Sequence, residues 1–247
     1  MSKKRSVLSV FLSELFAAGV FSMMFFIFAS RFASPNFEMT HLDFAYIIGA
    51  GYLVAVFVSS YHFSAHILPI YSIVEAVIKS NPKIVLVRVP AQIIGTIIAL
   101  LVFNGLQSAI LVQGTMEGLI GFKQYQLNDP YLLIFIQGGL ILTMSYLYHI
   151  VKNIFGLRKF TGGLLLGLLL TTIFAVTGQI EGIFIANPFG YLFYTIFNTD
   201  YLSNPLQAED WKNLIVVVLL FALVPLLVKL RSLEMLRSKN EINEYDI

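Results

Sequence analysis

Six stretches of the chain are apolar over about twenty residues, which is the length that a helix needs to cross a bilayer. Short polar segments separate them and hold most of the charged residues. We expect membrane-spanning helices near residues 8–30, 42–62, 84–105, 130–151, 161–180 and 212–231. The pattern therefore predicts an all-α membrane protein whose 247 residues form one transmembrane domain, followed by a polar tail at 232–247.

A further apolar stretch, Ser64 to Ile78, lies between two of these windows and is too short to span. Pro69 can open a helix there, because the N–H that proline lacks would be unpaired in the first turn anyway. The run Lys79-Ser80-Asn81-Pro82 ends it. This pattern predicts a re-entrant half-helix, whose non-helical start must be packed in protein or line a watery cavity. The alternative is an ordinary short helix at the membrane surface.

A second short segment, residues 188–197, follows the fifth window in the same order of span, loop, proline and half-helix. The two halves of the chain, residues 7–105 and 130–231, are therefore predicted to be inverted repeats. Their half-helices would meet head to head at the midplane, with the positive ends of both helix dipoles facing the same place. Such an arrangement orients neutral polar solutes and repels cations.

The distribution of positive charge predicts the topology. All but Arg31, Lys123 and Lys212 of the 16 Lys and Arg residues fall on one side of the six windows. Because positive residues concentrate in cytoplasmic segments, both termini and the tail are expected in the cytoplasm, with the chain in the plasma membrane.

Composition supports a membrane protein and argues against an enzyme. Hydrophobic residues make up 57% of the chain and charged residues 12%, about half the charged share of a soluble domain. The chain has no cysteine, which excludes disulfides, thiolate metal sites and a cysteine nucleophile. It has no His-Glu-x-x-His motif and no phosphate loop. His62 and His66 are four residues apart, but no third metal ligand is evident, so neither metal nor cofactor is expected.

Several motifs carry a resemblance to one family. The run Ser64-Ala65-His66-Ile67-Leu68-Pro69-Ile70 resembles the Gly-Ala-His-x-Asn-Pro-Ala signature of the aquaporin and glycerol-facilitator (major intrinsic protein) family, with Leu68 in place of Asn and Ile70 in place of Ala. The run Ala91-Gln92-Ile93-Ile94-Gly95 is similar to the third span of that family. The resemblance implies six spans, two half-helices and a homotetramer.

The resemblance also implies site residues. Glu14 and Gln137 match polar positions of the first and fourth spans, where they would brace the half-helix loops by accepting backbone N–H groups; a proton relay through Glu14 is the alternative. The selectivity constriction maps to Ile48, Phe174, Ile183, Phe189 and Gly190, and is apolar. The junction of the half-helices maps to His66, Leu68, Pro69, Ile70, Ala186, Asn187 and Pro188.

The second signature fits in two registers. Without a gap, Ala186 occupies the position of its Asn; with one inserted residue, Asn187-Pro188 is restored. Neither register supplies the pore arginine of the family.

The resemblance implies a passive channel for a small neutral solute such as glycerol, for water, or for both. The expected partners are the lipid bilayer and this solute, with no nucleic acid. Two alternatives remain. One is a secondary transporter or the membrane subunit of an import system. The sequence shows no intramembrane charged pair, which argues against this alternative. The other is a channel-like scaffold that conducts nothing.

Overall fold

The computed structural model of the chain describes residues 6–32, 41–60, 65–110, 130–154, 159–177, 215, 218–231 and 233. Within these ranges the regular structure is helical and includes no β-strand, which confirms the all-α prediction. The helices are α1 (Val7–Phe32), α2 (His41–Ser60), α3 (Pro69–Ile78), α4 (Lys83–Ile110), α6 (Pro130–His149), the π-helix η2 (Ile150–Ile154) and α7 (Lys159–Thr177). Residues 218–231 are also helical.

The described part of each of the six apolar windows is helical. Two helices carry a stretch that is long and apolar enough to cross a membrane, Val7–Ile27 in α1 and Lys83–Leu106 in α4. Ala45–Ser59 in α2, Thr161–Ile173 in α7 and the whole of α3 are apolar but shorter. The structure therefore gives weak support for a membrane protein, and six spans remain a prediction.

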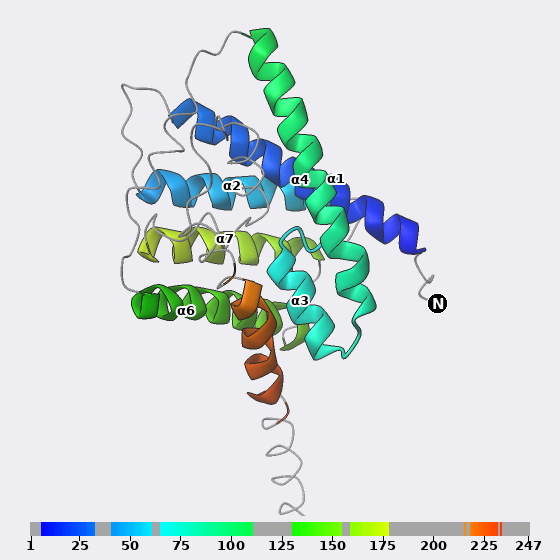
Figure 1. Cartoon of the computed structure of the whole chain (residues 1–247), viewed down its shortest axis with the longest axis vertical. Coiled ribbons are helices and arrows are strands. Elements are labelled where there is room, and N and C mark those ends of the chain that lie inside the picture. Colours follow the sequence, from blue (N-terminus) through cyan, green and yellow to red (C-terminus); the bar gives the residue numbers. More distant parts are fainter. Residues whose placement is uncertain are drawn as a thin grey trace, which may run out of the picture.

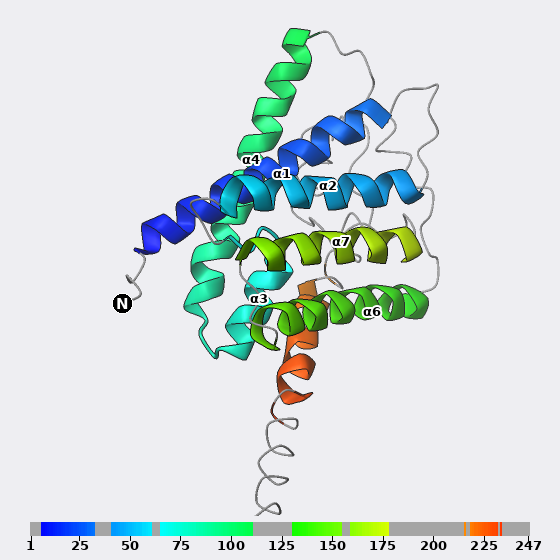
Figure 2. The same ribbon diagram turned by 180° about the vertical axis from the view of Figure 1, so that it is seen from behind.

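The helices form a row and a crossed pair. Helices α2, α7 and α6 lie side by side in the row, and α1 crosses α4 beside it (Figures 1 and 2). Helix α1 packs mainly on α4 and then on α2, while α2 packs on α7. The short helix α3 packs on α4 and α6, so it lies between the crossed pair and the row (Figure 1).

Small residues bring α1 and α4 into close contact. A Cβ atom added to Gly95 would lie 2.2 Å from the carbonyl oxygen of Leu15, and one added to Gly19 would lie 3.3 Å from that of Gly95. Beside this contact, the hydroxyl of Ser22 in α1 and that of Thr96 in α4 share a hydrogen bond of 3.0 Å. This crossing brings the N-terminal half of α1, and with it Glu14, next to the start of α4.

Helix α3 has the bounds that the sequence predicts. It starts at Pro69, and Leu68 at its N-cap has no side-chain acceptor for the first N–H groups. It ends where Ser80 takes a left-handed conformation (φ 49°) and the N–H of Asn81 bonds to the carbonyl of Ala76. The side chain of Asn81 then accepts the N–H of Lys83, which begins α4.

Several predicted site residues lie outside the described residues. These are Ile183, Ala186, Asn187, Pro188, Phe189 and Gly190, together with the second half-helix at 188–197. Gln137 lies in α6 and Phe174 in α7, but their side chains are outside the described set. The repeat relation between the two halves and the junction of two half-helices therefore remain predictions.

Candidate functional site

The segment before α3 is buried and has an unusual backbone. The N–H of Leu68 bonds to the carbonyl of His66 at 2.9 Å, and Ile67 between them has φ 72°. This combination describes a γ-turn with positive φ, a rare and strained turn, and a β-branched residue seldom adopts it. Side chains from His66 to Ile70 are all buried. Strain of this kind persists only where neighbouring groups hold it.

Glu14 of α1 is the group that holds this segment. Its side chain is fully buried, at 0% exposure. One oxygen, Oε1, accepts the N–H of His66 at 2.8 Å, and the other, Oε2, accepts the N–H of Ile67 at 3.2 Å. The contact that the resemblance implies for Glu14, a carboxylate on the loop N–H groups, is therefore present in the structure.

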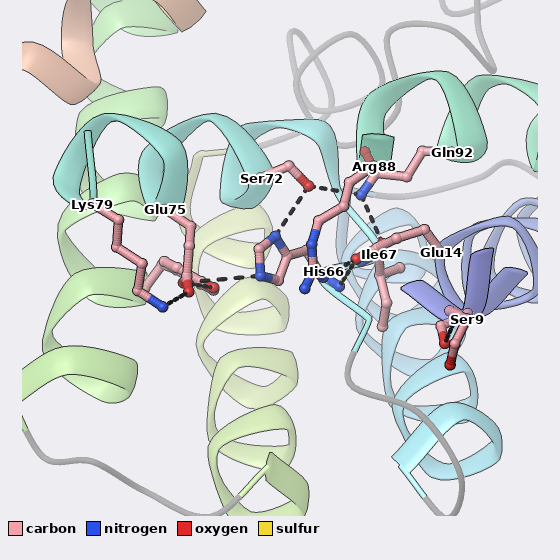
Figure 3. A network of polar contacts seen from close by, with 11 residues as sticks. Ser9, Glu14, His66, Ile67, Ser72, Glu75, Lys79, Arg88 and Gln92 are labelled. Atoms are coloured by element: carbon pink, nitrogen blue, oxygen red, sulfur yellow. Dashed lines mark hydrogen bonds and ion pairs between the residues drawn. The ribbon is translucent and has the colours of Figure 1, made fainter. Parts of the chain in front are cut away.

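Two side chains of α4 approach the same carboxylate from the other side. Arg88 donates from Nη1 to Oε1, and Gln92 donates from Nε2 to Oε2 at 2.9 Å (Figure 3). Residues four apart lie on one face of a helix, which explains why both reach Glu14. Gln92 also donates to the hydroxyl of Ser72 in α3 at 3.0 Å. The amide of Gln92 therefore links α1, α3 and α4.

His66 continues the network along α3. Its Nδ1 lies 3.1 Å from the Ser72 hydroxyl, and its Nε2 lies 3.8 Å from Oε2 of Glu75. The Ser72 hydroxyl accepts from Gln92 and shares a hydrogen bond with Nδ1, in which the tautomer of His66 decides which group donates. Figure 3 shows these side chains in a line from Glu14 towards Lys79.

Glu75 joins this line to α6. Tyr148 donates its hydroxyl to Oε2 of Glu75 at 2.6 Å, and Lys79 forms an ion pair with Oε1 one turn along α3. The ring of Tyr148 stacks on that of Tyr71 with centroids 4.7 Å apart, and it meets His66 edge-on at 5.7 Å. The stacked rings thus hold α3 against α6, while the Glu75 carboxylate orients the hydroxyl of Tyr148.

The charges of this network cancel in pairs. Glu14 pairs with Arg88, and Glu75 pairs with Lys79. Burial lowers the pKa of His66 well below its usual value of 6.5, and nearby cations, Arg88 first among them, lower it further. His66 is therefore neutral at physiological pH. Burial alone would raise the pKa of Glu75, but hydrogen bonds from Lys79 and Tyr148 outweigh it and bring that pKa below its usual value of 4.5.

The structure brings together the predicted residues of the first half. His66, Leu68, Pro69 and Ile70 form the buried start of α3, and Glu14 contacts its loop. Ile48 is buried in α2, and the structure does not test its predicted place in a constriction. Among the described residues, no group of three or more His, Cys, Asp or Glu side chains could hold a metal ion.

Sequence reasoning missed four residues of this network. They are Arg88, Ser72, Glu75 and Tyr148, and the sequence analysis uses Arg88 only as one of the positive charges that predict the topology. Two signals could have found two of them. Arg88 precedes Gln92 by one helical turn inside an apolar stretch, and Glu75 is the one charged residue of α3.

The charged pair also corrects an argument from the sequence. The absence of an intramembrane charged pair counted against a transporter. Glu14 and Arg88, from the two helices that are long and apolar enough to cross a membrane, form a buried ion pair in the structure. This pair weakens that argument against the transporter alternative.

Comparison with known proteins adds no identification. No model of a known protein family matches the chain, and no curated protein sequence matches it.

Proposed function

We propose that this chain is a passive transmembrane channel for a small neutral solute such as glycerol, for water, or for both, and a divergent member of the aquaporin and glycerol-facilitator family. In this proposal the chain forms six spans with two re-entrant half-helices, assembles as a homotetramer, and lies in the plasma membrane with both termini in the cytoplasm.

One observation carries the proposal. A buried non-helical segment, residues 66–68, leads into the short helix α3 and is held by a carboxylate from α1. Helix α1 carries one of the two stretches that are long enough to span a membrane. Non-helical backbone is tolerated at membrane depth only where protein satisfies it or a watery cavity adjoins it. Glu14 supplies the first of these conditions, and we place the solute path beside this held segment.

The electrostatics of the site favour a neutral solute over an ion. Its two carboxylates each have a cationic partner, and His66 is neutral. The positive end of the α3 dipole lies at Pro69, where Leu68 offers no side-chain cap. Polar but uncharged molecules can interact with such an end without the desolvation cost that an ion carries.

Stopped-flow light scattering on proteoliposomes tests this function. The purified protein is reconstituted, and shrinkage after a sucrose shock is compared with swelling in an inward glycerol gradient. The proposal predicts glycerol-driven swelling faster than in protein-free liposomes. Because the predicted constriction is apolar, we expect a smaller increase in the rate of water flux. The channel would be rejected if shrinkage and glycerol-driven swelling were each as fast in protein-free liposomes as in liposomes with protein.

A secondary transporter is the second candidate, and the buried Glu14–Arg88 pair favours it. Buried charged pairs within membrane helices often belong to ion or proton pathways. The same liposomes distinguish the two functions. A channel passes glycerol at the same rate with or without a pH gradient, whereas a proton-coupled transporter speeds up when the gradient is imposed.

A further inference from the structure

The carboxylate of Glu14 receives hydrogen-bond donors on both oxygens. Oε1 accepts from the His66 N–H and from Arg88, and Oε2 accepts from the Ile67 N–H and from Gln92. A carboxylate offers about four acceptor positions, so these four donors fill it. All four partners donate to the carboxyl group, which is the arrangement of an ionised carboxylate.

Arg88 is the one charged partner among these four. The two backbone N–H groups and the amide of Gln92 orient the carboxylate but carry no net charge, whereas the guanidinium cancels its charge. Glu14 is fully buried and the Arg88 side chain is 15% exposed, so little water screens the interaction between them. A buried charge that loses its partner is costly.

We propose that Arg88 is a positioning and selectivity residue of this site. It cancels the charge of Glu14, so that the carboxylate can hold the loop before α3 without attracting cations to the solute path. The selectivity role rests on the proposed channel function, whereas the positioning role does not. Nothing in the resemblance implies this arginine, because the pore arginine of the family maps to the second half of the chain.

The geometry explains why both roles fall to the same side chain. Glu14 accepts the N–H groups of His66 and Ile67 and so holds the strained turn at Ile67. The carboxylate that does this leaves one negative charge close to the start of α3. A lone negative charge beside a solute path raises the local concentration of cations. Arg88 removes this attraction and leaves the hydrogen bonds in place.

A double-mutant cycle in proteoliposomes tests both roles. The variants are Arg88→Met, Glu14→Gln, the double variant Glu14→Gln/Arg88→Met, and the conservative Arg88→Lys. Gln92→Met is the matched control, because it removes a donor to the same carboxylate without changing the charge. For each variant, glycerol influx, potassium flux and the melting temperature in detergent are measured at equal amounts of folded protein.

We expect Arg88→Met to raise potassium flux relative to glycerol flux by about tenfold, the equivalent of about 1.4 kcal/mol of added attraction. The ratio of potassium to glycerol flux should return towards the wild-type value in the double variant Glu14→Gln/Arg88→Met and in Arg88→Lys. In Gln92→Met this ratio should stay as low as in the wild type. Loss of a buried ion partner should lower the melting temperature of Arg88→Met by about 10 °C, with a smaller loss in the double variant.

Each role has results that would overturn it. An unchanged ratio of potassium to glycerol flux in Arg88→Met rejects the selectivity role, as does an equal rise in Gln92→Met. Additive losses of melting temperature in the cycle reject the positioning role. If wild-type liposomes pass no glycerol, the proposed function and the selectivity role fail together, while the melting temperatures still decide the positioning role.

Discussion

Ile67 adopts a backbone conformation that a β-branched residue rarely takes, and Glu14 supports it through the adjacent N–H groups. A residue in this region of φ costs about 1–3 kcal/mol, so the turn depends on the bonds that hold it. The turn leads the chain into Pro69, where α3 begins. A single carboxylate thus holds the segment that leads into this helix.

Replacement of Glu14 by leucine should destabilise the protein strongly. The N–H groups of His66 and Ile67 would lose their acceptor, at about 1–3 kcal/mol each, and the ion pair with Arg88 would be lost. We expect a lower melting temperature and a lower yield of folded protein in detergent. Ser13→Ala is the control on the same helix, because it removes one local bond to the Ser9 carbonyl. A leucine variant that melts like this control would refute the supporting role of Glu14.

His66 should make stability depend on pH. Because burial lowers the pKa of His66 in the folded protein, the unfolded chain takes up a proton below pH 6.5 that the folded chain does not bind. Stability should therefore fall as the pH falls below 6.5, by up to about 1.4 kcal/mol per pH unit. His66→Gln removes this contribution. Melting temperatures of both proteins between pH 5 and 7.5 measure it, and parallel curves would contradict it.

Some site residues could be predicted from the sequence because their chemistry conflicts with their surroundings. Glu14 is a carboxylate within an apolar run, so it must have partners wherever it lies. Arg88 lies near the start of its apolar window, where a charge usually reaches the membrane surface. Its inward direction depends on the crossing of α1 and α4, which no periodicity specifies.

At the scale of elements, the bounds of α3 follow from local chemistry and were predicted correctly. Proline can begin a helix, and the run from Lys79 to Pro82 ends it through a left-handed residue and a new cap. The π-helix at Ile150–Ile154 was not predicted. Its residues are compatible with a regular α-helix, so the extra residue per turn has no signal in the sequence.

The crossing of α1 and α4 should be sensitive to one methyl group. A Cβ at Gly95 would meet backbone atoms of Leu15 and Gly19, which cannot move without shifting α1. We expect Gly95→Ala to cost about 1–3 kcal/mol through overpacking. Gly105→Ala, on the same helix, has nothing within 4 Å of the added atom and should be neutral or stabilising by up to about 1 kcal/mol. Equal melting temperatures would argue against a tight crossing.

At the scale of the whole molecule, the apolar windows predicted where the helices lie but not how they pack. The pairing of α2 with α7 and of α1 with α4 joins segments far apart in the chain. All of these helices are apolar on most faces, so the sequence pattern does not specify which faces meet. The number of spans and the inverted repeat remain predictions, because they also involve residues outside the described ranges.

The predicted topology can be tested with single cysteines, since the natural chain has none. Ser6, Ser80 and Gly105 are exposed, the first before α1 and the other two near opposite ends of α4. Ser6→Cys and Ser80→Cys should react with a membrane-impermeant maleimide from the cytoplasmic side, and Gly105→Cys from the opposite side. Labelling of Ser80→Cys and Gly105→Cys from one side would show that α4 does not span the membrane.

The most direct test of the channel places a large side chain at the start of α3. Ile70 is fully buried there, whereas Ile98 on α4 is 45% exposed and serves as the matched control. Glycerol influx into proteoliposomes is measured for the wild type, Ile70→Trp and Ile98→Trp at equal amounts of folded protein. A solute path beside α3 predicts that Ile70→Trp abolishes the flux and Ile98→Trp retains it. Wild-type flux through Ile70→Trp, or no flux through the wild type, would contradict it.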